Sequence, residues 1–377
     1  NYEEELWGEI ESCHPLLLRA LRESSCTEAD RLLWALDAVL ADNYGISEIF
    51  GQYLQEEHQT SAWGEVADKM LAELVKYPAR GKSFTDGYKR SAVCGWIVHA
   101  LDCANRRSEA LVLCEQEAVK NGDYVRLVER LIAEAHYDDA KKWIDQGIAR
   151  TGQPAPGIAS QLRGKLREIH TLRQDWPSLI LLEVANFVQL PGARYFEQCR
   201  AASENLSAWP ELRQALLDFL VTGRMPWEHP SWPLPGRLPE AAQRVKIHFP
   251  VTDILTALAI QEKNPEEALR WFDLHHKNGN TFHSTFYDEF AGTVQTHVPD
   301  RAVKIWKGLA EREIARVSPS GYAEAEHYLR KARKVLHTRG LGAEWQQYII
   351  SLRKEHYRKK RFLEVLDGFD EKPLLEK

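Results

Sequence analysis

Histidine and carboxylate side chains gather at one place in this 377-residue sequence, where metal binding is the chemistry to consider. His275, His276 and His283 are followed by Asp288 and Glu289, and imidazole and carboxylate groups are common zinc ligands. On an α-helix, however, His275 and His276 point about 100° apart, so they cannot hold one metal ion without ligands from elsewhere. The spacing favours a solvent-exposed segment after a helix, and we predict no metal site.

Two other sets of residues carry side chains that can act together in catalysis. Cys94, His99 and Cys103 carry thiol and imidazole groups, but their spacing does not bring all three to one face of a helix. Asp138 and Asp139 supply two carboxylates. At the start of a helix, their charge is explained by a favourable interaction with the helix dipole rather than by acid–base catalysis. Neither combination predicts an active site.

Motifs of the common enzyme classes are absent from the sequence. There is no HEXXH, GXSXG, GXXXXGK(S/T) or GXGXXG, the patterns that build metalloprotease, serine hydrolase and nucleotide-binding sites. We therefore expect that the chain is not an enzyme and uses no cofactor. An active site assembled from separate loops stays open as an alternative, because such a site leaves no motif.

The densest concentration of charge is the stretch LRKEHYRKKRF (352–362). Its basic residues are Arg353, Lys354, Arg358, Lys359, Lys360 and Arg361. Such a cluster can contact nucleic-acid phosphates with an affinity that falls steeply with salt. However, Glu344 and Glu355 interrupt the cluster, we identify no aromatic platform for base stacking, and basic residues also stabilise a helix C-terminus. The solvated face of a terminal helix is therefore preferred, with nucleic-acid contact as the alternative.

Charge is distributed unevenly along the chain, although the net charge is only −6. Residues 300–377 carry 18 Lys and Arg against 12 Asp and Glu, whereas the preceding 299 residues carry 31 against 43. A basic end can attract a polyanion that an acidic remainder repels. We prefer the simpler explanation of an uneven helical surface. The 12 Trp, 13 Tyr and 12 Phe provide ample material for a packed interior.

Helical periodicity runs through almost the whole sequence, and convincing strand patterns are missing. In TEADRLLWALDAVLADN (27–43), apolar residues fall on one face of a helix that Thr27 is placed to cap. In SAWGEVADKMLAELV (61–75), a similar stripe runs as far as Val75. Asn264 precedes a proline and two glutamates, a strong helix start. The sequence predicts an all-α fold.

Four helical segments share a pattern in which a small residue precedes a large one by three or four positions. The alanines are Ala140, Ala268, Ala302 and Ala325, and their large partners are Trp143, Trp271, Trp306 with Ile305, and Tyr328. A small residue lets a neighbouring helix approach closely while the large one fills the space beside it. Ala268 and Ala302 lie 34 residues apart, the tetratricopeptide period, whereas Ala325 follows after only 23. We expect an irregular tetratricopeptide-like α-solenoid of antiparallel helix pairs.

A proline- and tryptophan-rich stretch, MPWEHPSWPLPGRLP (225–239), interrupts the helical pattern. Proline lacks a backbone N–H and disfavours helix in the residue before it, which predicts an irregular connection. We expect Trp227 and Trp232 to pack the connection against the helices. The predicted parts are an N-terminal helical array with degenerate repeats (1–220), the connection (221–249) and a C-terminal helical-repeat sub-unit with a basic end (250–377).

The expected compartment is the cytoplasm. The six cysteines form no CXXC pair, and a chain of this size needs no disulfides, so reduced thiols are the simplest interpretation. No apolar run approaches the 18 residues of a membrane span, and no signal-peptide pattern is present. Because the chain begins at Asn1 rather than at a methionine, we expect a fragment of a longer protein.

The C-terminal part of the chain resembles large bacterial proteins of the SWIM zinc-finger family. The resemblance is most specific over 322–367, in Ala325 with Leu329, in Glu344-Trp345, and in Leu352-Arg353 with Lys360-Arg361. Weaker similarity in the helical segments 61–71, 137–149 and 206–220 extends it over most of the chain. The zinc finger of that family is a CXC followed by a CXH, suited to tetrahedral zinc, and this chain contains neither.

The resemblance implies the helical-repeat region that follows such a finger, with the finger upstream of Asn1 or lost. We therefore expect a non-enzymatic scaffold whose stacked helices present a protein or peptide partner with an electrostatically featured groove. Direct nucleic-acid binding through the basic C-terminal helices is the main alternative. An enzyme with a site not readable from the sequence is the second.

Overall fold

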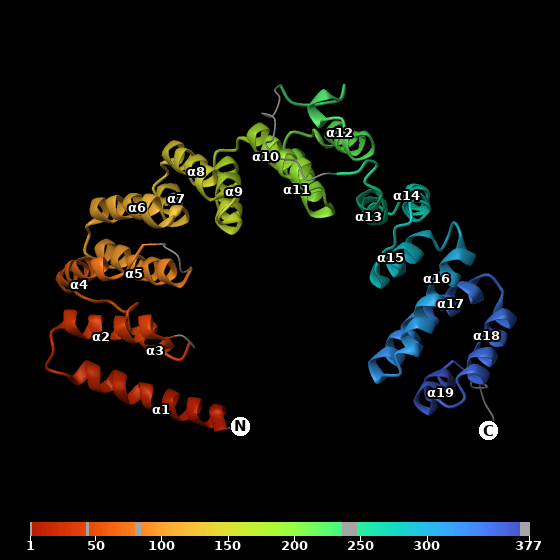
Figure 1. The fold of residues 1–377 in the computed structure, drawn as a ribbon, viewed down its shortest axis with the longest axis horizontal. Coiled ribbons are helices and arrows are strands. Elements are labelled where there is room, and N and C mark those ends of the chain that lie inside the picture. Colours follow the sequence, from red (N-terminus) through yellow and green to blue (C-terminus); the bar gives the residue numbers. More distant parts are fainter. Residues whose placement is uncertain (1, 43–44, 80–83, 236–246, 370–377) are drawn as a thin grey trace. The chain divides into compact units, whose positions relative to one another are not determined.

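The computed structural model describes residues 2–42, 45–79, 84–235 and 247–369. Over these ranges the regular elements are all helices, 19 α-helices and two short 3-10 helices, which confirms the predicted all-α helical-repeat fold. The chain divides into two compact units, residues 1–175 and 176–377, each with its own packed interior (Figure 1).

Unit 1 is a succession of helices that pack on their neighbours in the chain. It contains α1 (Tyr2–Glu23), α2 (Glu28–Ala41), α3 (Glu48–Tyr53), α4 (Thr60–Glu73), the 3-10 helix η1 (Leu74–Lys76), α5 (Phe84–Cys103), α6 (Arg107–Asn121), α7 (Tyr124–Ala133), α8 (Tyr137–Thr151) and α9 (Pro156–Leu172). Each helix from α4 to α8 packs against the next one. Such nearest-neighbour packing is the defining property of a helical-repeat array.

Local sequence signals set most helix boundaries in unit 1. Thr27 accepts a hydrogen bond from the backbone N–H of Asp30, at 3.1 Å, and so caps α2 as predicted. The apolar stripe of α4 was predicted to include Val75. This is wrong for that residue, because Val75 is 84% exposed. The chain passes from α4 into η1 at Leu74, and the tighter winding of a 3-10 helix rotates Val75 away from the interior.

A buried ion pair ties three elements of unit 1 together. Arg90 on α5 donates two hydrogen bonds to the carboxylate of Glu117 on α6, at 2.7 and 2.6 Å. The same guanidinium donates to the carbonyl oxygens of Leu74 and Tyr77, at the start of η1 and just beyond its end. Because both charged side chains are only 4% exposed, loss of one would leave the other buried without its partner.

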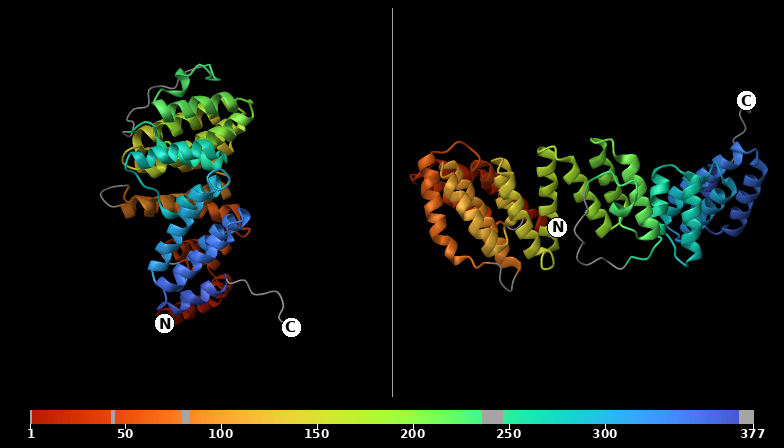
Figure 2. Two further views of the ribbon diagram at one scale, coloured as in Figure 1. Left: turned by 90° about the vertical axis from the view of Figure 1, so that its right-hand side faces the viewer. Right: turned by 90° about the horizontal axis from the view of Figure 1, so that it is seen from above.

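Unit 2 is a second succession of packed helices. It contains α10 (Trp176–Gln189), α11 (Ala193–Glu204), α12 (Trp209–Thr222), the 3-10 helix η2 (Pro226–Glu228), α13 (Thr252–Gln261), α14 (Pro265–Lys277), α15 (Ser284–Val294), α16 (Pro299–Ala315), α17 (Pro319–Thr338), α18 (Gly342–Glu355) and α19 (Lys360–Asp367). The pairs α13–α14 and α16–α17 share the most extensive contacts. Figure 2 shows α16 to α19, in blue, as one packed group.

The repeated alanines lie where neighbouring helices meet. Ala140, Ala268, Ala302 and Ala325 are all fully buried. Of their large partners, Trp271, Trp306 and Tyr328 are buried, and Trp143 is partly buried against the interior of unit 1. These positions agree with the close helix approach that the sequence pattern suggested.

The proline-rich connection lies within unit 2. Trp227 and Trp232 pack against the interior formed by α10 to α14, as expected from the sequence. Residues 236–246 of the predicted connection lie outside the described residues. The helices on either side of it pack together, and the backbone N–H of Val251 donates to the carbonyl of Leu220 at 2.9 Å. The observed division of the chain, after Asp175, therefore differs from the boundary predicted at 221–249.

Replacing Arg90 with methionine tests the buried ion pair. We expect R90M to lower the free energy of unfolding of unit 1 by about 3–5 kcal/mol, because Glu117 remains buried without its partner. Urea unfolding of the full chain measures the change. K142M, which removes an ion pair with Asp139 whose side chains are both mostly exposed, is the matched control and should leave the unfolding midpoint unchanged. Equal effects of the two substitutions would contradict this assignment.

Candidate binding groove

The residues of α16 divide between a buried face and an open face. Pro299 occupies the first turn, where its missing N–H costs nothing. Ala302, Trp306 and Ala310 are buried beneath neighbouring helices. The residues left on the open face follow helical spacing and are Arg301, Lys304, Ile305, Gly308 and Arg312, with the buried Leu309 at its edge. The residues of the open face are therefore the ones that α16 presents to a ligand.

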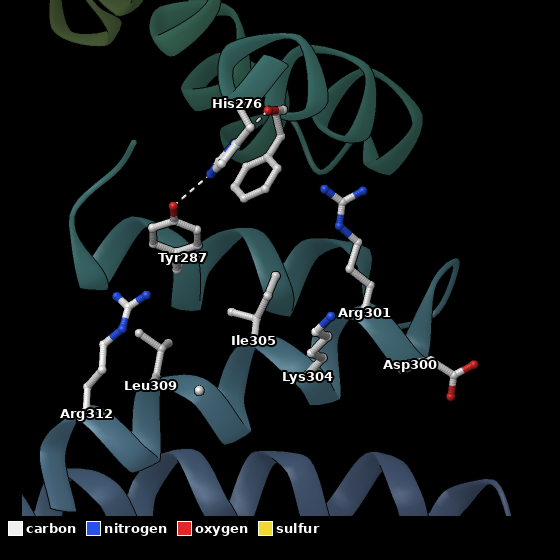
Figure 3. Close-up of a pocket in the computed structure, with 10 residues that line it drawn as sticks. His276, Tyr287, Asp300, Arg301, Lys304, Ile305, Leu309 and Arg312 are labelled. Atoms are coloured by element: carbon white, nitrogen blue, oxygen red, sulfur yellow. Dashed lines mark hydrogen bonds between the residues drawn. The ribbon is translucent and has the colours of Figure 1, made fainter. Parts of the chain in front are cut away.

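The open face of α16 forms one wall of a groove with a volume of about 660 Å³ (Figure 3). Phe272 and His276 from α14 and Tyr287 from α15 line the opposite side. A groove of this size matches the usual range for ligand sites. In Figure 3, Arg312 stands at one end of the groove and Arg301 and Lys304 stand toward the other.

Stacked and hydrogen-bonded aromatic rings make the far wall rigid. Phe272 stacks on Phe290 with ring centroids 3.7 Å apart. The Nδ1–H of His276 donates to the carbonyl of Phe272, at 2.9 Å, because a carbonyl oxygen can only accept. In the neutral imidazole, Nε2 of His276 then accepts from the hydroxyl of Tyr287, at 2.7 Å. The ring of His276 is thereby held by both nitrogens.

The groove carries positive charge that the protein does not neutralise. Arg301 pairs with Asp273, and Asp300 pairs with Arg339 and points away from the groove in Figure 3. Lys304 and Arg312 are exposed, and neither forms an ion pair with any residue that the structure describes.

Arg312 is nevertheless positioned. Its guanidinium lies 5.8 Å from the centre of the Tyr287 ring, a cation–π contact. The groove therefore offers two cationic side chains, one of them held against the aromatic wall, to an anionic ligand.

Gly308 leaves an open space in the middle of the groove wall that α16 forms. A Cβ atom placed on Gly308 would meet no other atom within 4 Å, so the space beside it is empty. Glycine inside a helix is destabilising by roughly 0.5–1 kcal/mol relative to alanine. A larger side chain would therefore fit at position 308 without a clash. The effect of the glycine is to leave the groove open between Lys304 and Arg312.

A smaller hollow of about 430 Å³ lies on the side of α16 toward α18 and has a different charge. Lys304 and Gly308 line it as well, but Glu311 and Glu344 add carboxylates. Lys307 there is paired with Glu344, at 3.2 Å. The groove toward α14 and α15 differs from this hollow because it combines unpaired cations with an aromatic wall.

His275 and His276 are packed in the structure, so the predicted solvent exposure is wrong for them, whereas His283 and Glu289 are exposed. His275 and His276 occupy the last turn of α14, and His275 is 7% exposed. The Nδ1 of His275 lies 2.9 Å from the hydroxyl of Thr252, and its ring stacks on Phe282 at 3.9 Å. Aromatic residues that follow α14 cover these histidines, and the spacing alone could not show this.

Asp288 serves packing instead of metal binding. Its carboxylate accepts the indole N–H of Trp306 at 2.7 Å and the ammonium of Lys331 at 2.7 Å. No group of three or more His, Cys, Asp or Glu side chains suited to a metal occurs among the described residues.

The thiol and imidazole groups of unit 1 are close but not activated. The Sγ of Cys103 lies 3.6 Å from Nε2 of His99. Burial raises the pKa of the Cys103 thiol and lowers that of His99, so both groups favour their neutral forms. Cys94 is buried separately, and burial raises its pKa to about 12. An activated cysteine requires the opposite shift.

The basic C-terminal cluster is divided between two elements. Arg353 lies on α18 and pairs with Asp367 at 2.7 Å, and Lys359 donates to the carbonyl of Ile314 at the end of α16, at 3.0 Å. The exposed members are Lys354, Arg358, Lys360 and Arg361. Tyr357, which the sequence interpretation overlooked, is 62% exposed and accepts a hydrogen bond from Arg358 at 2.8 Å.

The groove residues were missed by the sequence interpretation, although α16 contains a signal. Arg301, Lys304, Gly308 and Arg312 share one helix face, and none of the four side chains belongs to the buried core. Read alone, these residues look like a solvated surface. Only the aromatic wall from α14 and α15 makes them part of a groove.

Comparison with known proteins does not assign the chain to a family. No protein-family model matches the chain, and no curated protein does.

A pH dependence tests the packing of His275. Burial lowers the pKa of His275, so the folded state holds it neutral while the unfolded state binds a proton below about pH 6.5. Stability is therefore complete above that pH and is lost as the pH falls toward the lower pKa of the folded state. Urea unfolding at pH 7.5 and 5.5 should show a smaller loss in H275Q than in the native chain.

The exposed His297, in the connection between α15 and α16, provides the control for that experiment. H297Q should lose as much stability on acidification as the native chain. An equal loss in H275Q would show that His275 titrates alike in the folded and unfolded states and would contradict the assignment.

Proposed function

We propose that the chain is a non-enzymatic binding scaffold that holds a peptide segment of a partner protein in the groove between α14, α15 and α16. The single observation that carries the proposal is the combination in one groove of an aromatic wall, two unpaired cations and the open space beside Gly308. Helical-repeat arrays recognise protein segments on such surfaces. The groove has the electrostatic character expected of a scaffold.

Two findings favour this function over direct nucleic-acid binding. Two of the six predicted basic residues, Arg353 and Lys359, already have partners within the protein. Among the remaining cations, Arg358 lies over the ring of the exposed Tyr357, whereas binding of single strands relies on several stacking platforms along a basic groove. The groove on α16 combines cationic and apolar surface within one concavity, as peptide recognition requires.

We also propose, on the residues given above, that the chain is the tetratricopeptide-like helical-repeat region of a bacterial SWIM-type protein. The regular helices α17, α18 and α19 over 322–367 support this, since the family pattern there is helical. The cytoplasm remains the proposed compartment, supported by six free thiols. No described helix is long and apolar enough to cross a membrane.

Filling the groove tests the proposed function. The 377-residue chain is used to select binders from a random 12-residue peptide library displayed on phage. We expect the selected peptides to lose binding to G308L, because a leucine side chain at position 308 projects into the space that they occupy. Since leucine is the better helix former, G308L should unfold at a higher urea concentration than the native chain, which excludes unfolding as the cause.

Gly164 supplies a matched control. It lies near the middle of α9, which like α16 has 17 residues, and a Cβ there also meets nothing within 4 Å. G164L should bind the selected peptides as the native chain does. Failure to select any peptide, or equal binding to G308L, would overturn the proposal.

The nucleic-acid alternative has its own test in the exposed part of the basic cluster. R358A/K360A/R361A removes three cations without touching Lys359, whose ammonium is engaged at the end of α16. With fluorescent 20-nucleotide single-stranded and duplex DNA at 50 mM NaCl, we expect no affinity that depends on these residues. Binding that falls steeply with salt and disappears in the triple variant would establish the alternative instead.

A further inference from the structure

We infer that the groove binds an extended acidic segment of the form acid–X–apolar–X–acid, where X is any residue. The two carboxylates contact Lys304 and Arg312, and the apolar side chain occupies the open space beside Gly308. This inference rests on the proposed function and specifies its ligand. It follows from three properties of the groove, namely the spacing of the cations, the position of the gap between them, and the charge of the surrounding residues.

The spacing of the cations sets the distance between the two acids. Lys304 and Arg312 are eight residues apart on α16, which corresponds to about 12 Å along the helix axis. In an extended chain, residues four positions apart are separated by about 13 Å and point to the same side. Acids at positions 1 and 5 of a bound segment therefore match the two cations.

The gap between the cations sets the residue between the acids. Gly308 lies four residues from both Lys304 and Arg312, so it falls midway along the face. Position 3 of an extended segment lies midway between positions 1 and 5 and points to the same side. Ile305, which is partly exposed, lines the groove near Gly308, and its apolar surface favours an apolar side chain there.

The distance between the cations favours an extended segment over a helical one. An extended segment reaches both cations with acids four positions apart, whereas the same two positions on a helix are separated by only about 6 Å along its axis. An extended backbone is narrower and leaves its remaining N–H and C=O groups facing solvent, where water satisfies them.

The charge of the groove discriminates against basic and neutral segments. The neighbouring acids Asp273 and Asp300 are engaged by Arg301 and Arg339, so they do not cancel the charge of Lys304 and Arg312. Arg312 is held over the Tyr287 ring, which limits the freedom that it loses when it binds a carboxylate. The attraction acts between largely exposed groups and therefore weakens as salt shortens the Debye length.

Synthetic peptides with fixed composition test the inference. The first probe is a fluorescein-labelled 11-residue peptide with glutamates at positions 4 and 8, leucine at position 6, and serine, glycine and threonine elsewhere. The second probe has the same composition with the two glutamates adjacent at one end. Fluorescence anisotropy with the full-length chain should give at least about tenfold tighter binding of the first peptide at 50 mM NaCl.

Charge reversal identifies the contacts. K304E/R312E should weaken binding of the first peptide by about tenfold or more and should restore tight binding of a peptide in which lysines replace the glutamates. K354E/R358E changes the net charge equally at exposed positions outside the groove. It should leave the affinity within about twofold of the native value, because neither residue lines the groove.

The outcomes separate this inference from the proposed function. Equal affinity for the two isomeric peptides, or no effect of K304E/R312E, would overturn the acid–X–apolar–X–acid ligand. If peptides selected from the library lose binding to G308L but lack paired acids, the scaffold function stands and the inference alone fails. If G308L binds every selected peptide normally, both fail.

Discussion

The arrangement of the groove depends on how Trp306 is anchored. Its indole ring is buried between α15 and α17, and its N–H donates to Asp288, whose carboxylate also accepts the ammonium of Lys331. This network joins three helices and fixes the rotation of α16 about its axis. Since a helix places residues three and four apart on one face, fixing Trp306 inward turns Lys304, Gly308 and Arg312 outward. The open face of α16 follows from its buried face.

The same division of labour recurs in the rest of the chain. Fully buried alanines at positions 140, 268, 302 and 325 let neighbouring helices approach, and large residues fill the space beside them. Because each helix packs mainly on its neighbours, its remaining face carries no structural requirement. Unit 1 also contains a buried ion pair between Arg90 and Glu117. Its hydrogen bonds fix the positions of α5 and α6 relative to each other. Surfaces left open in this way are where repeat proteins accommodate ligands.

Much of the fold could be predicted from the sequence because its determinants are local. Helix starts at Thr27 and Asn264 were set by side-chain oxygens that accept backbone hydrogen bonds three residues on. The spacing of Ala268 and Ala302 indicated repeated helix packing. The predicted boundary at 221–249 differs from the observed division after Asp175, since prolines mark an irregular backbone and do not show which helices pack across it.

The candidate site could not be predicted because it depends on contacts between elements distant in sequence. The sequence shows Lys304, Gly308 and Arg312 on one helix face, but not that Tyr287 and Phe272 stand opposite them. His275 was expected in solvent, and the rings that bury it come from the segment after α14. The density of basic residues at 353–361 suggested a binding site. The sequence pattern does not show that Arg353 pairs with Asp367 or that Lys359 donates to the carbonyl of Ile314.

A crystal structure of the full chain bound to the peptide with glutamates four positions apart is the most direct measurement of the central claim. We expect an extended peptide along α16, with its carboxylates at the ammonium of Lys304 and the guanidinium of Arg312 and its leucine beside Gly308. A peptide seated on another surface of the chain, or lying in the groove with its carboxylates turned away from both cations, would contradict it.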